Sequence, residues 1–348
     1  MEGELGNFIK VWITVFISLC YCYIVGKSIA KGPLRLLFLL PIVCLFLYLP
    51  LELSSMHLGG LTGFFITWLG NFKLLLFAFG KGPLASDLSN LSLIRFVAVA
   101  SLPIKIFIND QNKETPSPKT PEKGQTSLLN YAIKGVLFAL LLRVYDYSEF
   151  IHPKVMLGLY GLHIYFSLEL TLAIVAAMAK SLTGDGELEP QFNEPYLCSS
   201  LQDFWGRRWN LMVTSILRQT VYEPTRNFSK HIIGRKWAPI PAVIATFSVS
   251  ALMHEIIFYY LSRLRPTWKI TWFFLLHGFC LNVEIVLKKT IGKKWRLPRL
   301  ISGALTIVVL MITSIWLLIP QLLRFQADVR TLEEIAAFGA FIRNVTRF

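Results

Sequence analysis

Apolar runs close to twenty residues long recur along the whole of this 348-residue chain. A helix of about 20 apolar residues is long enough to cross the hydrocarbon core of a bilayer. Hydrophobic residues make up 54% of the sequence and charged residues only 16%, below the roughly one quarter usual in soluble domains. The sequence therefore predicts an all-α, polytopic transmembrane protein rather than a soluble protein with a large core.

The apolar runs predict about eight or nine spans within one integral-membrane domain over residues 1–348. Eight of them lie at 8–25, 36–53, 58–79, 128–142, 155–178, 239–261, 268–287 and 300–323. The stretch 93–107 is shorter and contains Arg95, Pro103 and Lys105, so it is expected to be re-entrant, interfacial or a tilted ninth span.

Two long segments separate the spans. Residues 109–127 are polar, rich in proline and free of large apolar side chains, which predicts a disordered surface loop. Residues 181–238 form the other segment. With eight spans, the loops on its side of the membrane hold more than twice as many Lys and Arg residues as the loops opposite. The positive-inside rule then places 181–238 in the cytosol and the C-terminus in the lumen.

The net charge of +14 would suggest nucleic acid as the partner of a soluble protein, but the sequence has no nucleic-acid-binding motif. In a membrane protein, basic loops fit the positive-inside rule and contacts with anionic lipid or substrate phosphates. The five cysteines show no paired metal-ligand spacing, so we expect no metal site.

The span at 239–261 carries an ionisable pair, His254 and Glu255, near its middle. His254 lies about 20 Å along the helix from Pro241, well inside the bilayer. A histidine that only bridges two helices is the simpler interpretation, but neighbouring helix positions point about 100° apart. Two polar faces favour a polar cavity. A neutral imidazole there suits general base catalysis on an alcohol that attacks an activated acyl group.

A second unusual stretch, SLQDFWGRRWNL at 200–211, is dense in aromatic and cationic side chains. Arg207 and Arg208 are suited to phosphates, and the neighbouring Trp205 and Trp209 to stacking on an adenine ring, both of which coenzyme A presents. An interfacial helix explains the same composition equally well. The amide of Asn210 is suited to orienting reactants or stabilising negative charge, provided that the fold brings it to His254.

Other polar residues of the spans are weaker candidates. Ser250 lies one turn before His254 on the same helix face, and His277 and Asn282 lie in the following span with Glu284. We expect Ser250, His277 and Asn282 to line a substrate cavity, although each alone is more commonly a packed polar residue between helices. Serine hydrolase, P-loop and zinc protease motifs are absent.

The motif at 200–211 and the histidine span that follows it resemble those of a known family. SLQDFWGRRWNL, preceded by EPQFNEPYL and followed by a span with MHE, resembles the plant wax synthase-like branch of the membrane-bound O-acyltransferases. The resemblance extends from NFIKVW near the N-terminus through NFKLLLFAFGKGPL to SRLRPTWK and WFFLLHGF. The wider superfamily has an FYxDWWN-type motif and a later His-Glu pair. Here Gly206, Arg207 and Arg208 are inserted before Trp209 and Asn210, as in the plant branch.

The resemblance implies a central reaction chamber in the endoplasmic reticulum membrane. Acyl-CoA enters it from the cytosol as co-substrate, and a hydroxyl acceptor enters from lipid; no metal, bound cofactor or acyl-enzyme is required. His254 is then the base with Glu255 beside it, Asn210 is its partner, and Trp205, Arg207, Arg208 and Trp209 shape the coenzyme A entrance. A sterol or long-chain fatty alcohol is the expected acceptor. Diacylglycerol, including acetyl transfer to it, is the alternative.

Two hypotheses of other classes compete with the enzyme. A transporter or channel would use His254, Glu255 and Glu284 to line a polar pathway, but the sequence has no inverted repeat or pair of broken spans. A non-catalytic lipid-binding scaffold would bind acyl-CoA without turnover.

Overall fold

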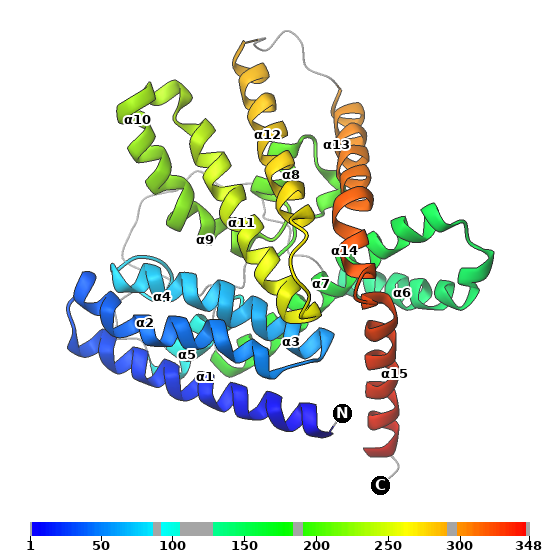
Figure 1. The fold of residues 1–348 in the computed structure, drawn as a ribbon, viewed down its shortest axis with the longest axis horizontal. Helices are drawn as coiled ribbons and strands as arrows, with labels where there is room; N and C mark the ends of the chain where they lie inside the picture. Colours follow the sequence, from blue (N-terminus) through cyan, green and yellow to red (C-terminus); the bar gives the residue numbers. More distant parts are fainter. Residues whose placement is uncertain (1, 86–91, 105–127, 184–190, 291–297, 346–348) are drawn as a thin grey trace. The chain divides into compact units, whose positions relative to one another are not determined.

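The computed structural model describes residues 2–85, 92–104, 128–183, 191–290 and 298–345 (Figure 1). Every regular element in these residues is helical, so the predicted all-α class is confirmed. Within these described ranges, eight helices are long and apolar enough to cross a membrane, and each overlaps one predicted span. They run Gly3–Ser28, Pro33–Glu52, Met56–Ala78, Leu128–Phe150, Pro153–Ser181, Pro239–Ser262, Lys269–Thr290 and Arg299–Leu323. The loop predicted at 109–127 lies outside the described residues.

The ambiguous stretch at 93–107 begins with a short helix. Helix α5 (Leu93–Ser101) has nine residues, which corresponds to about 14 Å at the rise of an α-helix. This is less than half of the roughly 30 Å hydrocarbon core, so α5 is too short to be a ninth span. Residues 105–107 are not among the described residues.

The chain forms two compact units. Unit 1 comprises Met1–Leu102, Ser215–Thr290 and Trp316–Phe348, and unit 2 comprises Pro103–Thr214 and Ile291–Ile315.

The N-terminal part of unit 1 is a layer of helices, drawn in blue and cyan in Figure 1. Helix α1 packs against α2 and α5, and α2 packs against α4. The third span is not one regular α-helix, because its middle is a π-helix, η2. The elements are α1 (Glu2–Ser28), α2 (Pro33–Tyr48), η1 (Leu49–Glu52), α3 (Met56–Thr62), η2 (Gly63–Gly70), α4 (Asn71–Ala78) and α5.

Two buried cations close helix ends in this layer. Lys73 has no exposed surface, and its Nζ donates hydrogen bonds of 2.6 Å to the carbonyls of Val99 and Leu102 at the end of α5. The guanidinium of Arg35 donates to the carbonyls of Gly26 and Ile29 at the end of α1. The last carbonyls of a helix lack partners within it, so these cations satisfy groups that would otherwise be costly to bury.

The second part of unit 1 is built on an antiparallel hairpin of α11 and α12, which also contacts α3 and η2. Arg263 has left-handed backbone angles (φ 55°) where α11 ends, and it donates to the carbonyls of Pro50, Leu51 and Leu53 in and after η1. The turn of the hairpin is thereby fixed to the N-terminal layer. The elements are η5 (Arg218–Tyr222), α10 (Glu223–Trp237), α11 (Pro239–Ser262), α12 (Lys269–Thr290), α14 (Ile319–Leu323) and α15 (Ala327–Val345).

The C-terminal helix α15 is fixed to the start of α3 by one carboxylate. Glu334 accepts hydrogen bonds from the backbone N–H groups of Met56 and His57, from the Ser55 hydroxyl and from the His57 ring at 2.8 Å. Burial alone would raise the pKa of Glu334, but these donors outweigh it and lower that pKa to about 2.

In unit 2, α6 and α7 are joined by a buried ion pair. Lys134 Nζ and Glu169 Oε1 are 2.5 Å apart, and both side chains are almost fully buried. Helix α13 contacts η4, and the Ser302 hydroxyl donates to the Ser199 carbonyl at 2.7 Å. The elements are α6 (Leu128–Val144), η3 (Tyr145–Phe150), α7 (Pro153–Thr183), η4 (Pro195–Leu197), α8 (Leu201–Arg207), most of α9 (Leu211–Leu217) and α13 (Arg299–Thr313); the π-helix η6 (Ser314–Leu318) follows α13.

Candidate active site

The imidazole of His254 lies in the middle of α11 and is only partly buried. Its Nδ1 is 2.7 Å from the carbonyl oxygen of Ser250, one turn earlier. A carbonyl oxygen can only accept, so Nδ1 carries the proton and Nε2 of the neutral ring is the unprotonated acceptor. Nε2 has no hydrogen-bond partner among the described residues. The helix therefore holds the neutral ring in the tautomer whose free lone pair lies on Nε2.

Two aromatic rings from other elements enclose this imidazole. Phe274 of α12 stacks on it with ring centroids 4.1 Å apart, and Trp68 of η2 approaches edge-to-face with centroids 4.9 Å apart. Three segments distant in the sequence thus meet at His254. Neither aromatic residue could be identified from the sequence, because each lies in an apolar run with nothing that links it to the histidine.

Glu255 faces the start of α12. Its Oε1 accepts hydrogen bonds from the backbone N–H of Thr271 at 3.1 Å and from the Thr271 hydroxyl at 3.0 Å. The first N–H groups of a helix lack partners within it and carry partial positive charge. Glu255 therefore caps α12 and fixes the register of the α11–α12 hairpin. This contact gives its buried carboxylate a structural role beside the predicted base.

The three residues predicted to line a substrate cavity are all buried in the same hairpin. Ser250 contributes the carbonyl that orients His254. The His277 ring packs edge-to-face on Phe273 with centroids 4.3 Å apart. Asn282 Nδ2 donates to the carbonyl of Ile240 at 3.2 Å, near the start of α11. Their predicted contact with substrate stays a prediction.

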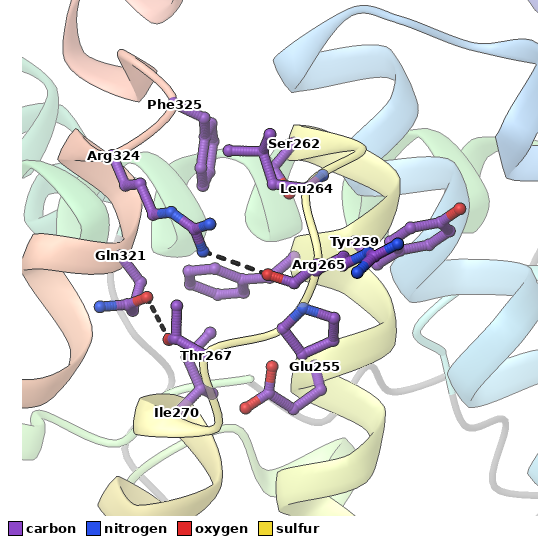
Figure 2. Close-up of a pocket in the computed structure, with 12 residues that line it drawn as sticks. Glu255, Tyr259, Ser262, Leu264, Arg265, Thr267, Ile270, Gln321, Arg324 and Phe325 are labelled. Atoms are coloured by element: carbon purple, nitrogen blue, oxygen red, sulfur yellow. Dashed lines mark hydrogen bonds between the residues drawn. The ribbon is translucent and has the colours of Figure 1, made fainter.

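A shallow pocket opens at the turn between α11 and α12, and Figure 2 shows its lining. Glu255 contributes to it from α11. Arg324 donates to the carbonyl of Arg265 at 3.1 Å, and the Thr267 hydroxyl is hydrogen-bonded to Gln321. These contacts tie the hairpin turn to α14 and to the residue that follows it.

The predicted coenzyme A motif forms α8 and the turn after it in unit 2. Ser200 caps α8 by accepting from the N–H of Asp203. Arg208 Nε donates to Asp203 Oδ2 at 2.8 Å, and its Nη1 donates to the carbonyls of Asn193 and Glu194. Burial would raise the pKa of Asp203, but the bonds from Arg208 and Ser199 hold it below its usual value. Arg208 thus closes the preceding loop onto α8.

The two arginines of the motif have different surroundings. Arg207 is exposed, and no hydrogen bond or ion pair to it is found among the described residues. Its guanidinium is free to meet a phosphate, whereas that of Arg208 is already engaged within the protein. The sequence alone gives the two neighbours the same chemistry and cannot distinguish them.

The tryptophans of the motif belong to an aromatic cluster. Trp209 stacks on Phe204 with centroids 5.3 Å apart and meets Phe192 and Tyr165 edgewise or tilted. Trp205 meets Phe204 edge-to-face at 5.0 Å. Much of their ring surface therefore stabilises the fold of the motif, and their predicted contact with coenzyme A is not tested by these contacts.

Asn210, the next-to-last residue of the motif, has a left-handed backbone conformation, with φ 40°. Asparagine tolerates this region better than most residues because its short side chain forms local hydrogen bonds. Its Oδ1 accepts from the N–H of Val213 at 3.2 Å, which caps α9. The amide therefore has a structural function, and its Nδ2 has no hydrogen-bond partner among the described residues.

The predicted site residues fall into the two units. His254, Glu255, Ser250, His277 and Asn282 belong to unit 1, and Asn210, Trp205, Arg207, Arg208 and Trp209 to unit 2. The predicted pairing of Asn210 with His254 stays a prediction. In the part of the chain that the structure describes, no group of three or more His, Cys, Asp or Glu residues could hold a metal ion.

The fold is that of a polytopic membrane protein, and one of its spans holds an oriented imidazole at His254. A model of the membrane-bound O-acyl transferase family matches residues 188–276, which include the motif and His254. The chain belongs to this family. Together with the relatives described next, this match confirms the predicted resemblance and makes the protein an O-acyltransferase, and it gives the transporter and scaffold hypotheses no support.

Curated relatives agree over nearly the full length. Acyl-CoA–sterol O-acyltransferase 1 of Arabidopsis thaliana is 49% identical over 99% of this chain and 98% of its own. Long-chain-alcohol O-fatty-acyltransferase of Simmondsia chinensis is 45% identical over 96% of this chain and 94% of its own. Probable long-chain-alcohol O-fatty-acyltransferase 1 of Arabidopsis thaliana is 44% identical over 93% of each chain.

Proposed function

We propose that this enzyme transfers the acyl group of an acyl-CoA to the hydroxyl of a lipophilic alcohol, a sterol or a long-chain fatty alcohol. The acceptor class is supported by relatives named for sterols and for long-chain alcohols. The observation that carries the chemistry is the hydrogen bond from His254 Nδ1 to the Ser250 carbonyl, because it leaves Nε2 as a proton acceptor inside a span.

The reaction then has two proton transfers and no covalent enzyme intermediate. The alcohol gives its proton to Nε2 of His254 while its oxygen attacks the thioester carbonyl carbon. When the carbon–sulfur bond breaks, the imidazolium returns this proton to sulfur, which leaves as the thiol of coenzyme A. The Ser250 carbonyl stabilises the imidazolium through Nδ1–H, as a hydrogen bond to the charged form does.

Asn210 is the proposed partner of His254. This assignment is supported by the hydrogen bonds of the amide, because Oδ1 caps α9 while the N–H donors of Nδ2 stay available for another group. An amide N–H is suited to the negative charge that develops on the thioester oxygen, where preorganised donors contribute most. Asn210 would thus combine a structural and a catalytic function in one side chain.

For the motif, we assign the coenzyme A phosphates to Arg207 and the fold of the binding segment to Arg208. The exposed, unbonded guanidinium of Arg207 supports the first assignment, and the bonds from Arg208 to Asp203 and to two backbone carbonyls support the second. Trp205 and Trp209, in the same motif, are assigned to stacking on the adenine ring.

Within the α11–α12 hairpin, Glu255 acts as a positioning residue. Its cap on Thr271 holds α12, and α12 carries the Phe274 ring that stacks on His254. His277 and Asn282 are proposed to border the acceptor cavity further along α12.

We further propose that both units act as one catalytic domain in the endoplasmic reticulum membrane. The segment 181–238 faces the cytosol, where acyl-CoA is available, and the C-terminus faces the lumen. The excess of basic residues in the loops on the side of 181–238 supports this orientation.

A product profile tests the proposal. The full-length protein in lipid vesicles receives labelled acyl-CoA with equal amounts of a sterol, a long-chain alcohol and diacylglycerol, and the esters are separated by mass spectrometry. Sterol or wax esters are expected. Triacylglycerol alone would overturn the acceptor class, and a folded protein that forms no ester would overturn the reaction.

A further inference from the structure

The π-helix η2 places the Trp68 ring against the imidazole of His254, and the indole N–H of Trp68 has no function in the reaction proposed above. Trp68 is 2% exposed, and its indole Nε1–H is buried without a hydrogen-bond partner among the described residues. Buried indole N–H groups usually find a partner. The indole of Trp12 illustrates the rule in the same unit, because its Nε1 donates to the Thr62 hydroxyl at 3.2 Å.

The Trp68 indole that carries this unpaired N–H lies beside the proposed base. The Trp68 ring lies edge-to-face with the His254 imidazole, with centroids 4.9 Å apart, and Phe274 covers the imidazole with centroids 4.1 Å apart. A molecule bound beside the His254 imidazole would therefore lie close to the Trp68 ring. Leaving a buried donor unpaired costs free energy. An acceptor oxygen that enters and accepts a hydrogen bond from the Trp68 indole N–H would remove this cost.

The local backbone supports a functional explanation. Trp68 lies in the π-helix that runs from Gly63 to Gly70 within the third span. Such π-helical segments are rare, cost regular hydrogen-bond geometry and are frequently found at functional sites. Here the segment brings a residue of the N-terminal layer to the imidazole of α11.

We propose that the Trp68 indole N–H donates a hydrogen bond to the hydroxyl oxygen of the acceptor alcohol bound at His254. This inference rests on the proposed function. A hydroxyl has one donor and two acceptor lone pairs. Its O–H donates to Nε2 of His254, one lone pair accepts from Trp68, and the other attacks the thioester carbon. The indole thus fixes the rotation of the hydroxyl about its C–O bond. It also favours alcohols over acceptor molecules whose reacting atom cannot donate to His254 and accept from Trp68 at the same time.

Two substitutions at position 68 isolate the N–H group. Trp68→Phe removes the donor together with one ring, and 3-benzothienylalanine at position 68 replaces N–H by sulfur while keeping the bicyclic shape. Trp272→Phe is the matched control, because Trp272 is 63% exposed on α12. Each protein is assayed in vesicles for ester formation at varied alcohol and varied acyl-CoA.

The benzothienyl protein is expected to show an apparent KM for the alcohol raised roughly tenfold, from the loss of one hydrogen bond, with the KM for acyl-CoA unchanged. Trp68→Phe should change in the same direction and Trp272→Phe should match the wild type. An unchanged KM for the alcohol in the benzothienyl protein would overturn the inference, as would a fall in kcat alone, which would assign the donor to the thioester oxygen. If the wild type itself forms no ester, the proposed function fails and this inference fails with it.

Discussion

Replacing Asn210 separates its two functions, because alanine and glycine affect the cap and the backbone differently. Asn210→Ala loses the hydrogen bond from Oδ1 to the N–H of Val213, and the loss of such a cap costs about 1 kcal/mol. It also places an alanine, whose side chain forms no local hydrogen bond, at φ 40°, and this strain lowers the stability of the fold by about 1 kcal/mol more. Asn210→Gly tolerates the positive φ and caps nearly as well, at a cost of a few tenths of a kcal/mol.

The two variants should therefore differ in stability by about 2 kcal/mol while sharing one catalytic defect. Both lack the amide N–H, and loss of one preorganised donor lowers kcat by about 10²- to 10³-fold. Thermal unfolding in detergent and ester formation from labelled acyl-CoA give the two quantities on the same preparations. An Asn210→Gly enzyme with the wild-type rate would refute the catalytic role, and equal stability of the two variants would refute the cap.

Three further predictions follow from the surroundings of charged residues. Arg207→Ala should raise the KM for acyl-CoA without lowering the melting temperature, whereas Arg208→Ala should lower the melting temperature; the reverse assignment would contradict the structure. Glu255→Gln should keep most of its activity, because an amide oxygen still caps Thr271, and loss of activity in a stable Gln variant would show that the carboxylate acts in the chemistry. The depressed pKa of Glu334 stabilises the fold above its unfolded value of 4.5, and this contribution is lost as the pH falls towards about 2. The melting temperature of Glu334→Gln should accordingly fall less between pH 6 and pH 3 than that of the wild type, and parallel curves would contradict the assignment.

The spans were predictable because their signal is local. Apolar length and composition alone place all eight candidate spans. The same signal fails at 93–107, since only the folded chain shows that α5 ends at Ser101, where Lys73 of the third span satisfies its last carbonyls. The π-helical middle of the third span likewise depends on packing that no periodicity reveals.

The sequence was sufficient to predict which residue types form the candidate site, but not which residues contact one another there. A histidine in mid-span indicated a base, but its tautomer follows from a carbonyl one turn away, and its walls come from Trp68 and Phe274 on other elements. Arg207 and Arg208 differ because two backbone carbonyls of the loop before α8 accept hydrogen bonds from Arg208, whereas none among the described residues accepts from Arg207. Such contacts depend on the tertiary fold, which spacing within one motif does not encode.

The central claim is that His254 is the general base, and its replacement tests this most directly. His254→Gln keeps a polar side chain of similar length but provides no basic nitrogen, and His231→Gln on the exposed face of α10 is the matched control. With both proteins folded in vesicles and saturated with acyl-CoA and alcohol, ester formation should be lost in His254→Gln and unchanged in His231→Gln. A folded His254→Gln enzyme that forms ester at the wild-type rate would contradict the account.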